Sequence, residues 1–477
     1  MKNIFKFFAV ALVMFTVISC DKNEILPNNS LEDVITLSAS IGTGDTKTSL
    51  GNDFSVLWSE GDAIAVIQGN NVFEFSLVSG AGTTSGVFIC ENHEGFQASQ
   101  AFQAFYPYRD NLLNEDGNVD FEVVARQNHL TNTFNIDVAP MAAYSASGTS
   151  LTFANLFSVL KLQLKGITET VRSIEVTSMT NANLCGPAVF SFSEEGMPAL
   201  EGWKLNNSST RTVILDCGEE GVQLKTDEPT DFMIMIPPGV GQGWAVVIKT
   251  DNNTYYKSSS QSHNVASGKI VVMQSLDLSS SENVNKLTAN SYVENGVYLG
   301  EGIKVDDLYW APVNCGYEKA IGSYKGYTWG KLYQWGRDSG CGFSDGSDDS
   351  DASIGDFTSS YTAGENWSND PCPDGWRVPK KDELGSLTRV SSAPEMNNGQ
   401  EGYWYGSNTT TKFVFFPAAG YRIGTGSKNR RSTCIYWSST YYSSFYCLNC
   451  KTGNIETSSC STAYPVRCVK DVAPMPS

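Results

Sequence analysis

The chain has 477 residues, of which 18% are charged and 41% are apolar, and its formal net charge is −18. This length suits about three domains, and the apolar content is that of folded protein and not of a disordered chain. The excess of negative charge excludes the broad basic surface that attracts nucleic acid, so we expect no nucleic-acid partner.

The two parts of the chain differ in composition. Residues 20–295 carry 14 Lys and Arg against 32 Asp and Glu, whereas residues 296–477 carry 17 against 19. The second part also holds eight of the 12 cysteines, and 28 aromatic residues against 23 in the first. Two differently built regions therefore share one chain.

Residues 1–19 have the pattern of an export signal. Lys2 and Lys6 precede an apolar run that is shorter than the roughly 20 residues needed to span a bilayer. The run ends in Val-Ile-Ser before Cys20, which is similar to a bacterial lipobox, where the cysteine carries lipid. We expect a lipid-anchored protein on the outer-membrane surface, tethered by residues 20–32. The alternative is an ordinary signal peptide that happens to end next to a cysteine.

Residues 33–278 have the pattern of antiparallel β-sheet. Residues 72–77 and 160–165 alternate between apolar and polar side chains, which is typical of half-buried strands. No long segment carries a helical apolar stripe, and turn residues recur throughout, so we predict β-sandwiches with a break near 142–149. The predicted sandwiches are residues 33–145 and 146–278.

Short motifs in this region resemble those of fimbrillin-like proteins. Thr46–Leu50 and Val56–Ile64 are similar to the family's N-terminal signature, in which a Thr-Arg-Thr segment precedes a Trp-x-x-Gly-Asp-x-Ile strand entry. Phe105–Tyr108 fits the same pattern, and Leu151–Leu160 resembles the strand that opens the family's second sandwich. The resemblance implies two transthyretin-like β-sandwiches in a lipoprotein that joins other pilin subunits by strand exchange.

Two residues of the signature refine this expectation. This chain has Lys47 where relatives commonly carry arginine, which favours a terminal cap or a surface-anchored subunit over a shaft subunit. Trp58 is expected to begin a core strand, so its role is structural and not chemical.

The part after residue 278 shows a second resemblance. Asn369–Pro379, Tyr436–Ser444 and Tyr464–Asp471 are, in this order, similar to motifs of the Fibrobacter succinogenes major paralogous domain, which has a C-type-lectin-like fold. The expected fold class is therefore mainly β, with two transthyretin-like sandwiches followed by an α+β C-type-lectin-like domain. The predicted segments are a linker at 279–295, the domain at 296–471 and a tail at 472–477.

The second resemblance implies a disulfide between Cys372 and Cys468, which would add about 4–5 kcal/mol in the chain-entropy model. The six other cysteines of this part allow fifteen connectivities, and we favour ordinary disulfides over a redox or metal site. Cys447 and Cys450 are three residues apart, so on a strand their sulfurs face opposite sides. The motif also predicts a short helix whose N-cap position holds Lys380 and not the usual hydroxyl residue.

Aromatic side chains are the main candidates for ligand contact. Trp404, Tyr405, Tyr441, Tyr442 and Tyr446 flank Ser- and Asn-rich stretches, a composition suited to stacking on sugars or docking on a protein. Packing in the core explains these residues equally well.

Two charged clusters have simpler interpretations. Residues 345–356 hold five carboxylates but do not fit the EF-hand spacing, so we expect a solvated acidic loop and no metal site. Residues 428–431, Lys-Asn-Arg-Arg, would suit an acidic partner, but a solvated turn is the default. Since no known catalytic motif occurs, we expect no enzyme, no catalytic residue and no cofactor.

These patterns predict a cell-surface lipoprotein that is a tip-like pilus subunit or an adhesin, whose C-terminal domain binds a host or bacterial glycan or protein. The competing hypothesis is a standalone surface glycan-binding lipoprotein in which the sandwiches form a stalk. A sulfatase-modifying-factor-like oxidative enzyme is the remaining alternative, and it would need a reactive cysteine pair.

Overall fold

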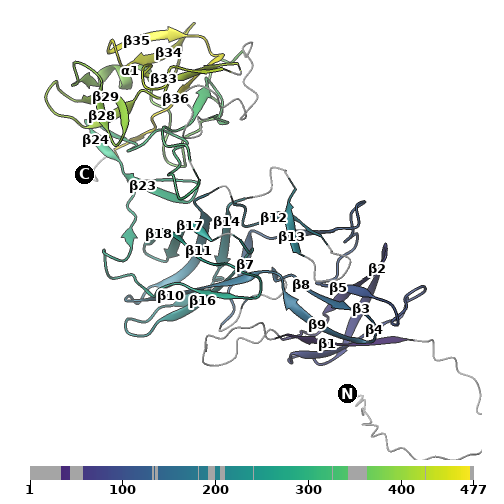
Figure 1. Cartoon of the computed structure of the whole chain (residues 1–477). Helices are drawn as coiled ribbons and strands as arrows, with labels where there is room; N and C mark the ends of the chain where they lie inside the picture. The colour runs from purple at the N-terminus through teal and green to yellow at the C-terminus, as the bar shows by residue number, and fades with distance from the viewer. Residues whose placement is uncertain are drawn as a thin grey trace, which may run out of the picture.

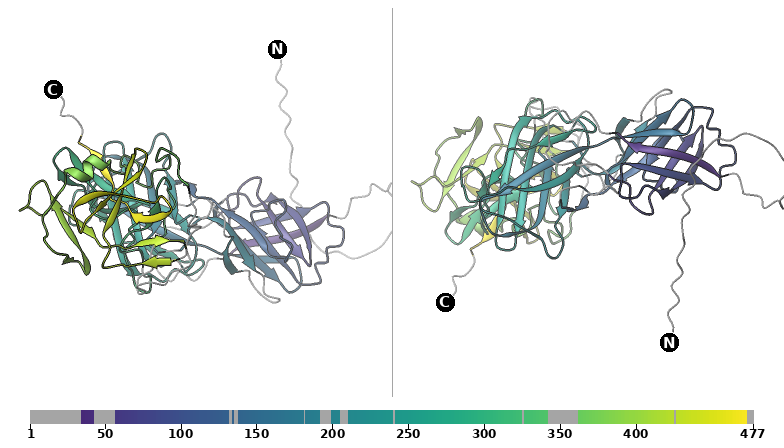
Figure 2. Two further views of the ribbon diagram at one scale, coloured as in Figure 1. Left: turned by 90° about the horizontal axis from the view of Figure 1, so that it is seen from above. Right: turned by 90° about the horizontal axis from the view of Figure 1, so that it is seen from below.

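The computed structural model describes residues 34–42, 57–131, 134, 138–180, 182–191, 199–204, 210–239, 241–324, 326–341, 362–424 and 426–472. They form three units, which we call the barrel, the central unit and the head. The barrel lies beside the central unit and the head lies against another side of it, so the molecule is bent (Figures 1 and 2). Among the described residues, no helix has the length and apolar character needed to cross a membrane.

The barrel is a ladder of seven strands that closes on itself. In ladder order the strands are β1 (Ile35–Ile41), β4 (Ser85–Cys90), β3 (Asn71–Ser79), β2 (Ala63–Gln68), β5 (Phe102–Tyr106), β8 (Met141–Ser145) and β9 (Ser150–Asn155). β1 closes the ring, because it pairs with β4 in antiparallel and with β9 in parallel orientation. The strands of the barrel therefore pair in one closed ring.

Trp58 lies at the centre of the barrel core. Its side chain is 1% exposed, and its ring packs edge-on against the rings of Phe88, Tyr106 and Phe153, with ring centroids 5.0–5.6 Å apart. Asp62 accepts hydrogen bonds from the Ser59 backbone N–H and the Tyr106 hydroxyl, which fixes the turn into β2. The Trp-x-x-Gly-Asp motif is thus structural, as predicted.

The central unit contains three groups of paired strands. One sheet consists of β16 (Thr230–Ile236), β10 (Ser158–Lys165) and β19 (Ile270–Val272), with β20 (Leu276–Asp277) also on β10. A second runs β21 (Asn285–Lys286), β18 (Thr254–Ser262), β17 (Gln242–Thr250), β11 (Thr170–Ser178), β14 (Thr212–Asp216) and β7 (Arg126–Asn128), with β15 (Val222–Gln223) on β11. A third comprises β13 (Ala199–Trp203), β12 (Gly186–Ser191) and β6 (Val119–Val123).

The barrel and the central unit exchange segments across the boundary predicted at residue 145. β6 and β7 precede it but pair with β12 and β14 of the central unit, whereas β9 follows it but completes the barrel. The segment Leu151–Leu160, which the resemblance assigned to one strand, is divided at 156–157 between β9 and β10. One continuous apolar core consequently runs through both units.

The segment 279–295, predicted to be a linker, contains structure at its end. β22 (Ser291–Glu294) pairs with β23 (Val297–Glu301), and Tyr292 is fully buried in the head. The linker prediction is therefore wrong for these residues. Two contacts hold the head against the central unit. Tyr298 of the head packs on Tyr256 of the central unit, and Glu318 of the head forms an ion pair with Arg211 of the central unit at 3.3 Å.

The head is built from short strands in several small sheets. One sheet contains β24 (Ile303–Val305), β25 (Leu308–Trp310) and β37 (Val469–Asp471), and another contains β26 (Leu332–Gln334), β36 (Thr462–Pro465), β31 (Tyr421–Ile423) and β32 (Gly426–Lys428). A further sheet contains β27 (Thr388–Arg389), β29 (Gln400–Gly406), β28 (Glu395–Asn397) and β30 (Val414–Pro417). A last sheet contains β33 (Ile435–Tyr441), β34 (Phe445–Asn449) and β35 (Asn454–Ser458). The described part of the chain contains one helix, α1 (Lys381–Ser386), at the position predicted from the motif.

The N-terminus of α1 has Lys380 at the N-cap position, as predicted. Lys380 offers no hydroxyl, but its backbone N–H donates a hydrogen bond to the Glu383 carboxylate at 2.7 Å. Arg377 holds the same carboxylate with two further hydrogen bonds of 2.7 and 2.8 Å. The carboxylate of the third helical residue thus caps the Lys380 N–H, and the Thr440 hydroxyl accepts a hydrogen bond from the Lys381 N–H at 2.9 Å. The fold is mainly β, as predicted, and the head, expected to be α+β, has α1 as the one helix among its described residues.

Candidate functional site

The head contains a cavity of about 510 Å³, which we call the arginine pocket. Its lining residues come from six segments that are distant in sequence but adjacent in the fold. They are Pro312, Val313, Asn314, Tyr317, Thr328, Trp329, Asn397, Asn398, Gly399, Gln400, Phe415, Pro417, Arg430, Arg431 and Arg467. A volume of this size matches the usual range of small-molecule sites.

The charge of the arginine pocket is positive. Three arginines line it and none of the lining residues that the structure describes is Asp or Glu, although the whole chain carries −18. Arg430 is 8% exposed, and its guanidinium carbon lies 5.7 Å from the centre of the Trp329 ring. Arg431 is exposed at the rim. The pocket thus combines cationic, amide and aromatic groups, which are suited to a polar and negatively charged ligand.

Arg467 forms the floor of the pocket and holds several walls together. Its guanidinium donates hydrogen bonds to Asn314 Oδ1 at 3.0 Å, to the Ala311 carbonyl at 2.9 Å and to the Phe415 carbonyl at 2.8 Å. All three acceptors are uncharged, so these bonds satisfy the guanidinium donors without cancelling the positive charge. Burial lowers the pKa of Arg467 from its usual value, which nevertheless leaves an arginine charged at neutral pH.

The walls of the pocket are fixed by further hydrogen bonds. Gln400 Nε2 donates to the Thr328 carbonyl at 2.6 Å, and Asn314 Nδ2 donates to the Trp329 carbonyl at 2.9 Å. Arg431 has a φ of 73°, in the left-handed region that long side chains seldom adopt. Its backbone N–H is anchored on the Ala418 carbonyl at 2.8 Å. Such backbone conformations persist where the surroundings impose them, and they gather at ligand sites.

The five aromatic residues proposed from the sequence lie elsewhere. Tyr405 is fully buried and its hydroxyl donates to the Cys450 carbonyl, so it has no surface to offer a ligand and the prediction is wrong for this residue. Trp404 packs on Phe415, with ring centroids 5.1 Å apart. None of the five is among the residues that line the arginine pocket.

The remaining three candidates lie on the β33–β34 hairpin. Tyr441 packs against Phe445, with ring centroids 5.0 Å apart, and Tyr446 lies under the ammonium of Lys381 at 4.8 Å. Tyr442 is 76% exposed. These tyrosines remain proposals for ligand contact, on a surface separate from the pocket.

The basic segment 428–431 was predicted to be a solvated turn. Arg430 contradicts this, because its side chain is buried against Trp329 in the pocket wall. Sequence analysis did not single out Trp329 or the Asn397–Gln400 turn, which are separated from Arg430 by about 100 and about 30 positions. No spacing rule joins such distant segments, and only the unusual Asn-Arg-Arg cluster could have signalled the site.

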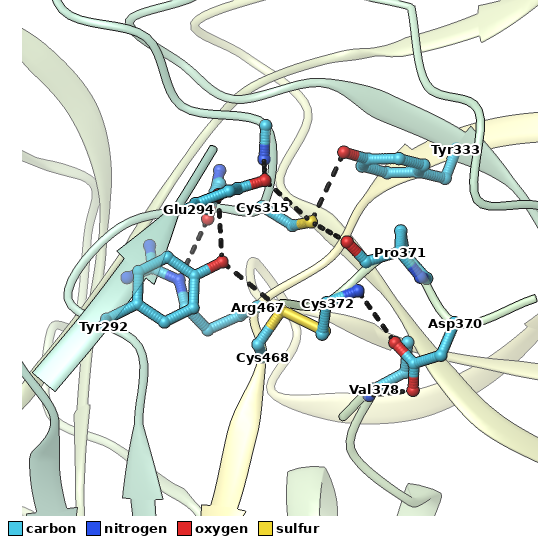
Figure 3. Close-up of a disulfide and its surroundings, with 12 residues drawn as sticks. Tyr292, Glu294, Cys315, Tyr333, Asp370, Pro371, Cys372, Val378, Arg467 and Cys468 are labelled. Atoms are coloured by element: carbon cyan, nitrogen blue, oxygen red, sulfur yellow. Dashed lines mark hydrogen bonds between the residues drawn. A yellow bond between two sulfur atoms is a disulfide. The ribbon is translucent and has the colours of Figure 1, made fainter. Parts of the chain in front are cut away.

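The disulfide between Cys372 and Cys468 that the resemblance implies is present, with an S–S distance of 2.07 Å. The Cys315 thiol lies beside it, and the three sulfurs are within 4.8 Å of one another (Figure 3). The Cys315 sulfur also contacts the Glu294 carboxylate at 3.5 Å and the Tyr333 hydroxyl at 3.3 Å.

This cluster is structural. Burial, together with the negative charge of Glu294, raises the pKa of the Cys315 thiol well above its usual value, and burial raises the pKa of Glu294 as well. The thiol is therefore protonated near neutral pH and is a poor nucleophile. Two of the three sulfurs are bonded to each other, which leaves no set of thiolates for a metal ion.

The remaining cysteines of the head differ from the expectation of ordinary disulfides. Cys341, Cys434, Cys447 and Cys450 are buried thiols outside any disulfide, and Cys460 is buried as well. The sulfurs of Cys447 and Cys450 belong to different apolar clusters, which agrees with the predicted opposite orientation on a strand. Small buried thiols pack like other apolar side chains, so the head needs no further cross-link to accommodate them.

Several predicted sites lie outside the described residues. They are the signal segment with Cys20, the tether, Thr46–Leu50 with Lys47, and the acidic loop 345–356.

Comparison with known families identifies the first part of the chain. The family model described as "Fimbrillin-like" matches residues 46–285, which is just over half of the chain. The chain therefore belongs to the fimbrillin-like family. No curated protein matches it.

Solved structures give more distant likenesses. A candidate cell adhesion protein from Bacteroides uniformis is 16% identical, covers 54% of this chain and 96% of its own, and has a TM-score of 0.34. A tip fimbrial protein from Porphyromonas gingivalis is 10% identical over 53% of this chain and 98% of its own, with a TM-score of 0.30. A fimbrial protein from Bacteroides ovatus is 11% identical over 90% and 97%, with a TM-score of 0.25. At these scores, the likenesses carry no argument about function.

Proposed function

We propose that this protein is a cell-surface fimbrial subunit of the tip type, or an adhesin, whose head binds a ligand in the arginine pocket. Membership of the fimbrillin-like family supports the fimbrial role and favours a structural protein over an enzyme. The observation that carries the binding role is the pocket itself, a preformed cavity whose walls are locked by hydrogen bonds and whose charge is opposite to that of the chain.

The barrel supplies the assembly part of this proposal. β1 is hydrogen-bonded to a neighbour on each side, to β4 and to β9. A strand donated by another pilin subunit in place of β1 would recover two backbone ladders at once, which is the physical basis of strand exchange. Lipid attachment at Cys20 and exposure on the outer membrane belong to the same proposal. The head then corresponds to the Fibrobacter-type C-type-lectin-like domain, and the barrel and central unit to the two fimbrillin sandwiches.

The second candidate is a standalone surface glycan-binding lipoprotein, in which the barrel and the central unit form a stalk. The arginine pocket fits this role equally well, since it lies in the head alone. The oxidative enzyme is less well supported. It needs a reactive cysteine pair, whereas the described thiols of the head are buried and Cys315 is held protonated.

The test separates assembly from binding. The purified full chain is mixed with pilin subunits of the source bacterium, and SDS-resistant oligomers are counted on gels while antibody against the head is located on pili by electron microscopy. A fimbrial subunit gives oligomers and label at pilus ends, and Arg430→Gln leaves both unchanged because its site is in the head. Absence of oligomers and label, together with specific binding on a glycan array, selects the standalone lipoprotein.

A further inference from the structure

We propose that the arginine pocket takes the carboxylate of an acidic sugar, a uronic acid residue of a glycan. This inference rests on the proposed function, since it names the ligand class of the same pocket. Arg430 and Arg431 meet the carboxylate, and the side-chain amides of Asn397, Asn398 and Gln400 meet the sugar hydroxyls.

Electrostatics selects a negative ligand. Among the described residues, the pocket is lined by three guanidinium groups and by no carboxylate. The Arg467 charge lies beneath it in a buried environment, where its three hydrogen bonds end on neutral oxygens. Charges in a concave, poorly solvated site produce a stronger potential than the same charges on an open surface. An anion that enters therefore gains more than a neutral molecule of the same shape.

The remaining lining groups select a sugar over a bare anion. Four of the lining side chains carry amides. Asn314 is bonded to Arg467 and to the Trp329 carbonyl, whereas Asn397, Asn398 and Gln400 carry amides that both donate and accept and so match hydroxyl groups that do the same. Tyr317 and Thr328 add hydroxyls. A cavity of about 510 Å³ is far larger than a phosphate or sulfate ion, so the ion alone would leave most of these groups unused.

The charge of the pocket is a local feature of the head. The head is close to neutral, with 17 Lys and Arg against 19 Asp and Glu in residues 296–477, so the pocket is where an acidic glycan finds a favourable potential. Binding through this potential weakens as ionic strength rises, because mobile ions screen the charges.

The experiment is isothermal titration of the full chain with two monosaccharides that differ at one carbon, galacturonic acid and galactose. We expect galacturonic acid to bind about tenfold or more tightly than galactose, because a charged hydrogen bond is gained. Arg430→Gln should abolish that advantage, and Arg431→Gln should reduce it. Arg389→Gln removes the same charge outside the pocket lining and should leave both affinities unchanged.

The outcomes that overturn the inference are distinct from those that overturn the proposed function. The acidic-sugar assignment is overturned by equal affinities for the two sugars. It is also overturned if galacturonic acid keeps its higher affinity in a folded Arg430→Gln variant, or if galactose 6-sulfate or hexa-aspartate binds more tightly than galacturonic acid. If Arg430→Gln does not fold, Asn397→Ala takes its place and should lower the affinity for both sugars. If the protein binds only neutral glycans on an array, and binds them through the pocket, the inference is overturned and the proposed function is preserved. If the protein binds no glycan on the array and the antibody labels no pili, the proposed function itself is overturned.

Discussion

The barrel and central unit on one side and the head on the other are stabilised in different ways. One apolar core runs from Leu37 to Val284 through the first two units. The head has instead several small apolar clusters, joined by the Cys372–Cys468 disulfide and by the hydrogen bonds of the buried Arg467. A region with short strands and small sheets buries less apolar surface per element, so covalent and polar links take a larger share of its stability.

The two regions also differ in what they offer a partner. The acidic first part presents strands with partners on both sides, such as β1, and its described surface has isolated exposed apolar residues such as Val78 and Val272. The head presents a preformed cavity with positive charge. The barrel and the central unit therefore suit assembly through backbone hydrogen bonds, and the head suits recognition of a ligand by its side chains.

The disulfide gives the largest expected difference between the regions. Replacing both Cys372 and Cys468 by serine removes a cross-link over 96 positions and should destabilise the head by about 4–5 kcal/mol in the chain-entropy model. Calorimetry of the full chain should show a lower unfolding temperature for the head and an unchanged unfolding temperature for the barrel. Cys217→Ser, which removes a free thiol from the first part, is the control. A head transition that does not move contradicts the account.

Trp58 provides the reciprocal test in the barrel. Trp58→Ala removes a side chain that is 1% exposed and should cost about 3–5 kcal/mol, since the cavity left behind closes incompletely. In this variant the unfolding temperature of the barrel should fall. Because the core is continuous, the central unit should follow it, while the head keeps its own transition. Equal destabilisation of all three units would show that the head does not unfold separately.

Arg467 tests the polar support of the head. Arg467→Met leaves the oxygens of Asn314, Ala311 and Phe415 without their donor and should destabilise the head by about 3 kcal/mol. Arg467→Lys keeps the charge but cannot reach three acceptors at once, so it should lie between the wild type and Arg467→Met. Urea unfolding followed by tryptophan fluorescence measures both. If Arg467→Met leaves the free energy of unfolding of the head unchanged, the stability of the head comes from its apolar clusters alone.

The smallest expected effect concerns Arg377 and is dependent on pH. Its guanidinium hydrogen-bonds the carboxylates of Glu383 and Asp471. Burial opposes ionisation of Glu383, but the bonds from Arg377 and from the Lys380 N–H outweigh it and lower its pKa, and the bond from Arg377 lowers the pKa of Asp471. Arg377→Gln should cost the head about 1 kcal/mol at pH 7.

The sign of this pH dependence follows from proton uptake. Both carboxyls are more acidic in the folded head than in the unfolded chain, so unfolding binds protons at low pH. The stabilisation is complete above the ordinary pKa values of 4.5 and 3.8 and is lost as the pH falls through the lower pKa values of the folded carboxyls. Urea unfolding should therefore show a larger difference between wild type and Arg377→Gln at pH 7 than at pH 3. A difference of equal size at pH 3 would attribute the loss to packing.

The features that could be predicted from the sequence are those encoded within a few residues. The core position of Trp58, the helix near Lys380 and the opposed orientation of Cys447 and Cys450 follow from local spacing. The disulfide followed from motif resemblance, which carries information about distant pairing that spacing does not.

The features that could not be predicted depend on distant partners. Tyr292 and Glu294 lie in a polar stretch with no apolar pattern, and they are buried because Cys468 and Gly316 contact them in the fold. The crossing of β9 into the barrel likewise depends on its pairing with β1, more than 100 positions earlier. The arginine pocket combines six segments, and no local rule indicates that Trp329 and Arg430 meet.

The central claim, that ligand recognition resides in the head and not in the scaffold, is tested most directly by hydrogen–deuterium exchange of the full chain with and without saturating galacturonic acid. The account predicts slower exchange of the amides in the turns at Asn397–Gln400 and Asn429–Ser432, and no change in the strands of the barrel or the central unit. Protection confined to the barrel or the central unit, at a concentration at which titration shows binding, would contradict it.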